Sequence, residues 1–253
     1  MREDLSQAAY GIRFEWGPAG AKQLAPQVSC LVIVDVLSFS TSVSVAVESG
    51  SRVFPYPWRD ETATAFARQM DAHLAVGRRA VTEASPWSLS PAALRRAPFA
   101  ARLVLPSPNG SAIAAAAAGA AVAVGSLRNG SAVGRWLAAQ GHGTAGRPVG
   151  VIAAGERWPD GSLRPAVEDL LGAGAVIAAL RGHDRGPLSP EAAAAAAAFA
   201  AAGDERAVGA AVAASASGRE LTEDGFAEDV AVATELDACE QVPVLRHGAF
   251  VPA

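Results

Sequence analysis

The sequence predicts an α/β protein with three layers, α/β/α, around a mixed, largely parallel sheet. Two observations support this prediction. Short apolar runs rich in β-branched residues, such as 31–34 and 149–153, are typical of strands that are buried on both faces. These runs alternate along the chain with helix-like segments, which is the pattern of parallel βαβ units. Because no linker stands out, we expect residues 1–253 to form one compact domain, with a division into two lobes as an open alternative.

The individual elements follow from local signals of strand, helix and turn. Continuous or alternating apolar runs predict strands at residues 11–16, 31–34, 52–56, 74–76, 103–105, 122–124, 149–153, 242–245 and 249–251. Capping residues, prolines and alanine-rich runs predict helices at residues 17–24, 38–49, 60–73, 91–96, 166–180, 192–202 and 205–215. One further helix is expected after each of two Asn-Gly-Ser steps, and another begins at about residue 222. The segments 77–99 and 155–164 are expected to be mainly loop.

The composition argues against nucleic-acid and membrane partners. The chain has 21 Lys and Arg against 25 Asp and Glu residues, a net charge of −4, and no run of basic residues. The apolar stretches 112–124 and 192–202 consist mainly of alanine, which is weakly hydrophobic and favours helices. The first thirty residues show no signal-peptide pattern. We therefore expect a cytoplasmic protein with reduced Cys30 and Cys239, and a homodimer, which is common for soluble enzymes of this size.

Polar residues follow the predicted strands at their carboxyl ends, where ligands bind in parallel α/β sheets. They are Asp35, Asn109, Ser126, Asn129, Gly155 and Glu156. Asp35, together with Glu168 and Asp169 in the first turn of a later predicted helix, offers the hard oxygen ligands that suit Mg²⁺. The alternative is structural, because acidic residues in a first helical turn interact favourably with the helix dipole.

Two Asn-Gly-Ser steps lie between a predicted strand and a predicted helix. Residues 109–111 follow the strand 103–105, and residues 129–131 follow the strand 122–124. Each step would place backbone N–H groups, an amide and a hydroxyl at a helix start, where the helix dipole favours an anion such as phosphate. An ordinary turn followed by a helix cap is the alternative interpretation.

Signatures of several other phosphate-transfer enzymes are absent from the sequence. The second residue after Asp35 is Leu37, so the paired aspartates of haloacid-dehalogenase-like phosphatases are missing. There is no Walker loop, and neither cysteine precedes the arginine loop that a cysteine phosphatase needs. Arg246-His247-Gly248 spells the histidine-phosphatase tripeptide, but it lies in a predicted hairpin near the end of the chain, where a turn histidine is the simpler interpretation.

Taken in order along the chain, several motifs resemble the 2-phosphosulfolactate phosphatase family. They are Asp35-Val36-Leu37 after a buried strand, Pro108-Asn109-Gly110-Ser111, Gly125-Ser126 with Asn129, Ala154-Gly155 followed by Glu168-Asp169-Leu170-Leu171-Gly172-Ala173-Gly174, and the closing stretch from Ser217-Gly218-Arg219 to Val242-Pro243-Val244. The resemblance covers residues 33–251. It implies a Mg²⁺-dependent phosphomonoesterase that acts on a small phosphorylated and sulfonated hydroxy acid in the pathway to coenzyme M.

The resemblance and the chemistry of the residues together suggest roles for the candidate site. Asp35, Glu168 and Asp169 are the expected catalytic and Mg²⁺-binding residues, with either a water or a side chain as the attacking group. The expected substrate is a small phosphorylated metabolite, and residues at or near the starts of predicted helices are expected to bind it. These residues are Ser38, Ser40, Thr41, Asn109, Gly110, Ser111, Ser126, Arg128 and Asn129.

Two positions depart from the family pattern. Members commonly carry an arginine directly after the Asp-Val-Leu step, where this chain has Ser38, and a Gly-Glu pair where it has Gly77 and Arg78. An arginine is a bidentate partner for phosphate or sulfonate, and Arg78, Arg128 and Arg157 are the candidates to replace the missing one. Two alternatives therefore stay open: a non-catalytic phosphometabolite-binding protein of the same fold, and an enzyme of the same mechanism that acts on a different phosphomonoester.

Overall fold

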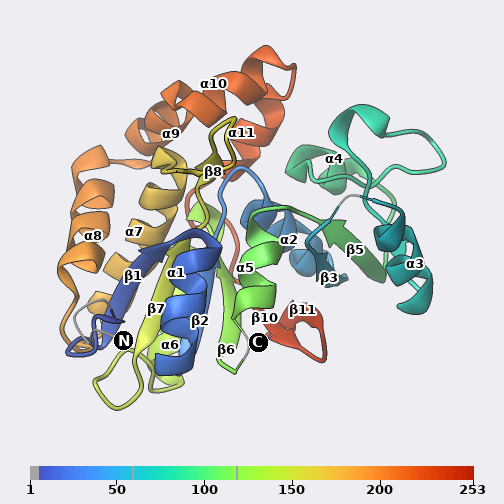
Figure 1. Ribbon diagram of the computed structural model, residues 1–253. Coiled ribbons are helices and arrows are strands. Elements are labelled where there is room, and N and C mark those ends of the chain that lie inside the picture. Colours follow the sequence, from blue (N-terminus) through green and yellow to red (C-terminus); the bar gives the residue numbers. More distant parts are fainter. Residues whose placement is uncertain (1–5, 59, 118) are drawn as a thin grey trace.

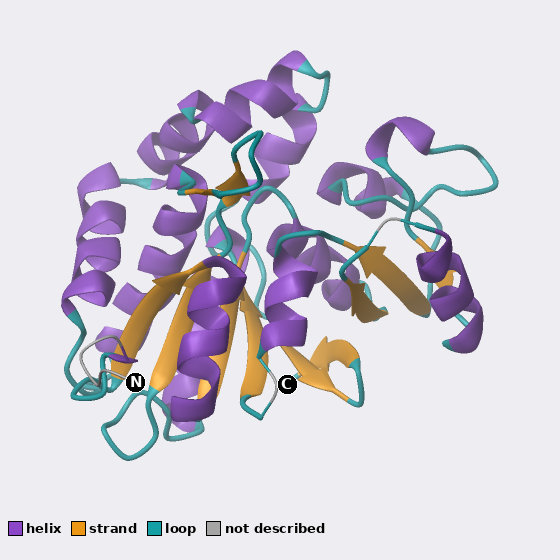
Figure 2. Ribbon diagram, viewed as in Figure 1, coloured by secondary structure: helices purple, strands orange, loops and turns teal. Residues whose placement is uncertain are grey.

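The centre of the molecule is a nine-stranded sheet. Figures 1 and 2 show helices on both faces of this sheet. The computed structural model describes residues 6–58, 60–117 and 119–253. The strands of the sheet are β1 (Ile12–Trp16), β2 (Cys30–Val34), β3 (Arg52–Tyr56), β4 (His73–Leu74), β5 (Arg102–Pro106), β6 (Ala121–Gly125), β7 (Val149–Ala153), β10 (Pro243–Arg246) and β11 (Ala249–Pro252). A separate hairpin consists of β8 (Glu156–Arg157) and β9 (Leu163–Arg164).

The helices connect these strands and cover the sheet. They are α1 (Gly17–Leu24), α2 (Phe39–Glu48), α3 (Glu61–Gln69), α4 (Pro91–Arg96), α5 (Gly110–Ala116), α6 (Gly130–Ala139), α7 (Val167–Arg181), α8 (Pro190–Ala202), α9 (Glu205–Ala214), α10 (Ala216–Glu223) and α11 (Ala227–Ala233), with short 3₁₀ turns η2 (Ala25–Gln27), η3 (Arg78–Ala80) and η4 (Leu127–Asn129). Within the described ranges, no helix is both long and apolar enough to cross a membrane.

The sheet has the strand order β1-β7-β2-β6-β10-β11-β3-β5-β4. The strands β1, β7, β2 and β6 pair in parallel, and so do β3, β5 and β4. The β10–β11 hairpin lies between these two groups and pairs antiparallel with β6 on one side and with β3 on the other. The closing hairpin predicted from the sequence is therefore the element that joins two parallel groups into one mixed sheet.

The central strands are buried on both faces because their side chains alternate between two layers of helices. In β2, Val32 and Val34 pack into a core with α6, α7 and α8, whereas Leu31 and Ile33 pack into a core with α1, α2 and α5. Figure 1 shows α1 and α5 on the near face of the sheet, and α9, α10 and α11 beyond the carboxyl ends of β1 and β7. The predicted three-layer α/β/α fold with a mixed, largely parallel sheet is confirmed.

Predictions for three segments were wrong, and in each case residues within the segment explain the difference. The predicted helix 60–73 stops at Gln69, before Asp71, whose φ of 47° is left-handed. The segment 155–164, predicted as loop, contains β8 and β9, whose two-residue strands are too short for an alternating pattern. A single helix was expected from about residue 222, but Gly225, with φ of 91°, separates α10 from α11.

Candidate active site

Asp35 lies at the carboxyl end of β2 and connects the starts of two helices. Its Oδ1 accepts a hydrogen bond from Phe39 N at 3.1 Å, so this carboxylate caps α2, whereas the side chain of the N-cap residue Ser38 makes no capping hydrogen bond. Its Oδ2 accepts one from Gly110 N at 3.0 Å, at the start of α5. The backbone N–H of Asp35 donates to Ser40 Oγ at 2.9 Å. The Asp35 side chain is thereby held between two helix N-termini, whose dipoles favour a negative charge.

Asp169, in the first turn of α7, connects the ends of β2 and β7. Its Oδ1 accepts a hydrogen bond from Val36 N at 2.7 Å, and its Oδ2 accepts one from Gly155 N at 2.8 Å. Gly155 has a φ of 65°, a conformation that glycine adopts without strain. Both oxygens of Asp169 therefore hold the loops that follow two adjacent parallel strands.

Two further carboxylates lie with these, and we define the acidic cluster as Asp35, Glu156, Glu168 and Asp169. Glu168 is only 2 % exposed, yet its side chain accepts no hydrogen bond from any residue in the described part of the chain. Glu156, in β8, accepts a hydrogen bond from Asn109 Nδ2 at 3.1 Å. Glu156 is absent from the predicted catalytic set, although its place directly after the strand 149–153 was a usable signal.

Burial and mutual repulsion raise the pKa values of three carboxyl groups in the acidic cluster. Burial raises the pKa of Asp35 to about 6, although two backbone hydrogen bonds oppose the shift. Burial, followed by the charge of Asp35, raises the pKa of Glu156 to about 7. Burial and then the charges of Asp35 and Glu168 raise the pKa of Asp169 well above its ordinary value. At neutral pH, such a cluster either keeps protons or gains stability from a bound cation.

The acidic cluster offers carboxylate oxygens to a cation, but the described residues form no preformed metal cage. Across residues 6–58, 60–117 and 119–253, no three His, Cys, Asp or Glu side chains are arranged to hold a metal ion. Mg²⁺ nevertheless fits, because it usually keeps several waters and binds through one or two carboxylates together with substrate phosphates. The Glu168 carboxylate accepts no hydrogen bond from the residues that the structure describes, and each oxygen of Asp35 accepts one hydrogen bond and keeps a second lone pair.

The hydroxyls of Ser40 and Thr41, predicted to bind the substrate, hold the loop that carries Asp35. Ser40 Oγ donates to the carbonyl oxygen of Ile33 at 3.1 Å and accepts from the backbone N–H of Asp35. Thr41 Oγ1 donates to the carbonyl oxygen of Val36 at 2.7 Å. Both side chains are fully buried. Their hydrogen bonds explain how the sequence after β2 fixes the position of the Asp35 carboxylate.

The first Asn-Gly-Ser step reaches the acidic cluster. Asn109 donates to Glu156 through its side-chain amide, and Gly110 donates to Asp35 through its backbone N–H. The hydroxyl of Ser111 points away from these contacts, because it donates to the carbonyl oxygen of Leu105 at 3.4 Å. Two of the three predicted residues are thus brought to the site, and they are bound to carboxylates there.

The second Asn-Gly-Ser step has the alternative role considered from the sequence, a turn and helix cap. Asn129 Oδ1 accepts hydrogen bonds from the backbone N–H of Ser126 at 2.8 Å and from its hydroxyl at 3.0 Å. Asn129 Nδ2 donates to the carbonyl oxygens of Val124 and Gln241. All the polar atoms of the Asn129 side chain are therefore used internally, and the structure does not bring Ser126 or Asn129 to the acidic cluster.

Arg128, another predicted substrate-binding residue, is buried at the far end of α2 from Asp35. Its guanidinium donates to Ser44 Oγ at 3.1 Å and to Glu48 Oε2 at 3.0 Å, and it lies 3.3 Å from Glu235 Oε2. These partners occupy all three guanidinium nitrogens. Arg128 thus connects α2 and η4 to the segment after α11, and the structure does not place it beside the carboxylates.

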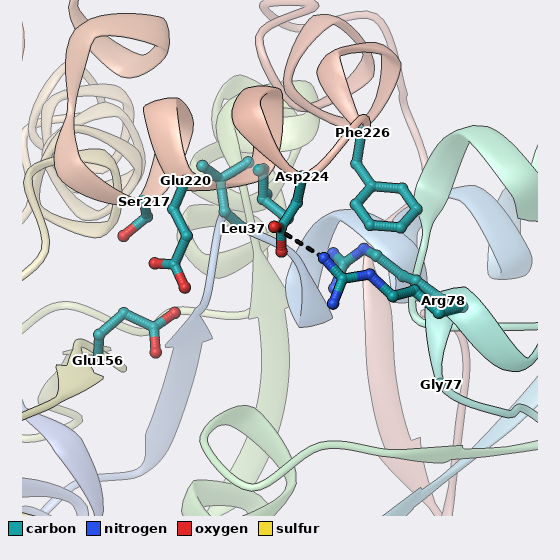
Figure 3. A pocket seen from close by; sticks show the side chains of 10 residues that line it. Leu37, Gly77, Arg78, Glu156, Ser217, Glu220, Asp224 and Phe226 are labelled. Carbon is teal, nitrogen blue, oxygen red and sulfur yellow. Dashed lines mark ion pairs between the residues drawn. The ribbon is translucent and has the colours of Figure 1, made fainter. Parts of the chain in front are cut away.

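A cavity of about 380 Å³ opens beside the acidic cluster, and we call it the α10–α11 cavity. Its walls include Leu37, Arg78, Arg79, Glu156, Glu220 and Phe226. Figure 3 shows the carboxylates of Glu156 and Glu220 on one side and Arg78 against Phe226 on the other. A second cavity of about 270 Å³ also includes Glu156, together with Asn109 and Arg157. Glu156 is therefore the residue of the acidic cluster that borders both of these cavities.

Fold and site together define an α/β protein whose candidate site residues gather at the carboxyl ends of parallel strands, the usual place for the active site of an α/β enzyme. A family model described as 2-phosphosulpholactate phosphatase matches residues 19–248. The chain therefore belongs to the 2-phosphosulpholactate phosphatase family, an enzyme family of phosphoric monoester hydrolases. A search of curated proteins gave no match.

Proposed function

We propose that the protein hydrolyses 2-phosphosulfolactate to sulfolactate and inorganic phosphate and that it requires Mg²⁺. The observation that carries this proposal is the buried acidic cluster, in which Glu168 accepts no hydrogen bond from the described residues. The family match supports the choice of substrate. In this proposal the protein is a cytoplasmic, single-domain enzyme that forms a homodimer and acts on a metabolite of the coenzyme M pathway.

Glu168 and Asp35 are the residues that would hold the metal ion. Glu168 is buried and no described residue donates a hydrogen bond to its side chain, and Asp35 keeps lone pairs that its two backbone hydrogen bonds do not use. When bound, Mg²⁺ would offset negative charge on the phosphoryl oxygens. The raised pKa values of Asp35 and Asp169 support the need for a cation, because burial without one disfavours their charged forms.

Asp169 and Glu156, the other residues of the acidic cluster, would position backbone N–H groups and hold a proton, respectively. Asp169 holds the backbone N–H groups of Val36 and Gly155, so it fixes the two loops between which the phosphoryl group would lie. Hydrolysis breaks the ester P–O bond while a water oxygen bonds to phosphorus, and the leaving hydroxy-acid oxygen takes up a proton. Glu156 borders both cavities, and burial raises its pKa to about 7, so it is suited to hold that proton on its carboxyl group.

Phosphate release from 2-phosphosulfolactate by the purified protein tests this proposal. We expect saturable release in the presence of Mg²⁺, loss of release with EDTA, and recovery when Mg²⁺ is restored. Release from another phosphomonoester alone would replace the substrate and keep the mechanism. Saturable binding of 2-phosphosulfolactate without release from any ester would contradict the enzyme proposal and favour the non-catalytic phosphometabolite-binding protein.

A further inference from the structure

Arg78 presents a positive charge to the α10–α11 cavity that the protein only partly uses. Its Nε donates to Asp229 Oδ2 at 2.8 Å, and its Nη2 donates to Ser38 Oγ at 2.6 Å. Its Nη1 donates to no residue in the described part of the chain, and the side chain is 17 % exposed. Since a guanidinium has five N–H donors, most of the donors of Arg78 remain available to a ligand.

The guanidinium of Arg78 is held in place before any ligand binds. Its carbon lies 5.6 Å from the centre of the Phe226 ring, a cation–π contact that is visible in Figure 3. Its partner Asp229 is itself buried and accepts hydrogen bonds from Ser90 Oγ and from Ala92 N. Contacts with Ser38 before α2, Phe226 before α11 and Asp229 in α11 therefore hold the Arg78 side chain, so binding an anion there costs little side-chain entropy.

Other arginines close to the acidic cluster are less suited to this role. Arg79 also borders the cavity, but its side chain is 73 % exposed and pairs with Asp224 at 2.8 Å. The guanidinium of Arg164 lies over the Trp158 ring and donates to Ser217 Oγ at 3.3 Å. Arg78 is thus a half-buried cation of this cavity that pairs with Asp229 and still keeps one nitrogen, Nη1, without a partner among the described residues.

The charges across the cavity set where an anion can lie. The carboxylates of Glu156 and Glu220 occupy the side opposite Arg78 (Figure 3), and they disfavour an anionic group at that end unless a cation such as Mg²⁺ is bound with it, as proposed for the phosphoryl group. An oxyanion that enters the cavity therefore gains most beside Arg78, where a planar guanidinium can donate two parallel hydrogen bonds to it. The volume of about 380 Å³ suits a small acid.

We propose that Arg78 binds the acidic group of the substrate that is not hydrolysed, a sulfonate or a carboxylate, and so selects phosphomonoesters that carry a second anion. This inference rests on the proposed function, in which the phosphoryl group lies at the acidic cluster. Arg78 is a binding residue in this scheme, and the step involves no covalent change.

Calorimetric binding of sulfolactate, which carries both acidic groups and no phosphate, tests Arg78 without turnover. Arg78→Met should weaken binding about 30-fold, as expected for the loss of charge-assisted hydrogen bonds. The matched control is Arg79→Met on the same cavity, which should bind within about threefold of wild type because Arg79 is exposed and already paired. If Arg78→Met fails to fold, Arg78→Lys serves instead, since it keeps a charge near Asp229 and loses the planar fork, with an expected loss of about tenfold.

The ratio of kcat/KM values for three esters distinguishes the two acidic groups. The esters are 2-phosphosulfolactate with both groups, 2-phospholactate with a carboxylate alone, and isopropyl phosphate with neither. For each acidic ester, preference is its kcat/KM divided by the kcat/KM of isopropyl phosphate. For the ester or esters whose acidic group Arg78 binds, this preference should fall about 30-fold in Arg78→Met and stay at the wild-type value in Arg79→Met. A loss for both acidic esters identifies the carboxylate, and a loss for 2-phosphosulfolactate alone identifies the sulfonate.

The outcomes separate this inference from the proposed function. Wild-type protein that binds sulfolactate through Arg78 but hydrolyses no ester would overturn the phosphatase proposal and leave Arg78 as an anion-binding residue. An active enzyme whose sulfolactate affinity and ester preference survive in Arg78→Met would overturn the role of Arg78 alone. Wild-type protein that neither binds sulfolactate nor hydrolyses any ester would overturn both.

Discussion

The backbone N–H of Gly110 donates a hydrogen bond to the Asp35 carboxylate at 3.0 Å, although 75 residues separate the two in the chain. This contact requires a close approach of α5 to the start of α2. A Cβ atom at position 110 would lie 2.2 Å from Cδ1 of Phe39, which is far closer than atoms can pack. Because Gly110 has no side chain, its backbone N–H can come close enough to donate a hydrogen bond to the second carboxylate oxygen of Asp35.

Gly110→Ala should damage both stability and activity. The added methyl group forces Phe39 or α5 to move, which we expect to lower the free energy of unfolding by about 1–3 kcal/mol. Phosphate release should fall at least tenfold because Asp35 loses a fixed donor. Denaturant unfolding and a phosphate-release assay measure the two effects. Gly146→Ala is the matched control, since its Cβ would meet nothing within 4 Å, and wild-type behaviour of both variants would contradict this explanation.

Asp169→Asn should lose activity together with stability. Both oxygens of Asp169 accept backbone N–H bonds, and an asparagine keeps one acceptor while turning an NH₂ group toward the other N–H. One buried donor is then left unpaired, at a cost of about 1–3 kcal/mol in the free energy of unfolding. Urea unfolding checks this loss against Glu168→Gln, which removes no hydrogen bond. Equal stability of the two variants would argue against a positioning role for Asp169.

The acidic cluster should make stability depend on pH. Glu156 has an ordinary pKa of 4.5 and a pKa of about 7 in the folded protein, so the folded state binds its proton more tightly than the unfolded chain. The contribution of Glu156 to the free energy of unfolding therefore falls as the pH rises from about 4 to about 7, by on the order of 2 kcal/mol.

Glu156→Gln isolates this effect, because glutamine can still accept the hydrogen bond from Asn109. The stability of the variant relative to wild type should increase between pH 5 and pH 8, as measured by urea unfolding without metal. Millimolar Mg²⁺ should reduce that difference at pH 8 by stabilising the wild-type protein more than the variant, because the charged Glu156 strengthens the attraction of the acidic cluster for a cation. A difference that stays constant across this pH range would show that Glu156 does not titrate as described.

Arg128→Met should affect folding and leave substrate affinity intact. The buried guanidinium of Arg128 pairs with Glu48 and Glu235 and donates to Ser44, so its removal should lower the free energy of unfolding by about 1–3 kcal/mol. The KM for 2-phosphosulfolactate should stay within about threefold of wild type. A large rise in KM with unchanged stability would instead support the substrate-binding role expected from the sequence.

Most of the fold could be predicted because each buried strand leaves a local pattern of apolar residues in the sequence. The apolar runs that became β2 and β7 are buried on both faces, and burial of that kind leaves a continuous hydrophobic pattern in the sequence. The β8–β9 hairpin leaves no such pattern, since Glu156, Arg157 and Arg164 are polar and each strand has two residues. The boundary between α10 and α11 depends on one left-handed glycine, Gly225, inside an otherwise helical segment.

The site could be predicted only in part, because identical motifs acquire different partners in three dimensions. Asn109 meets the carboxylate of Glu156, whereas Asn129 meets backbone groups and Ser126, although both begin an Asn-Gly-Ser step. The orientation of Arg78 depends on Asp229, which is 151 residues away in the chain. No local pattern predicts a contact over that separation, so the sequence could name Arg78 only as one of three candidate anion-binding arginines, together with Arg128 and Arg157.

Phosphate release from 2-phosphosulfolactate by Glu168→Gln, measured over increasing Mg²⁺ concentrations, is the most direct test that the acidic cluster holds the catalytic metal. Glu168 is buried without a protein hydrogen bond in the described part of the chain, so glutamine removes its charge and little else. We expect a fold at least as stable as wild type and at least a hundredfold loss of Mg²⁺-dependent release. Wild-type rates and Mg²⁺ dependence in the folded variant would contradict the assignment.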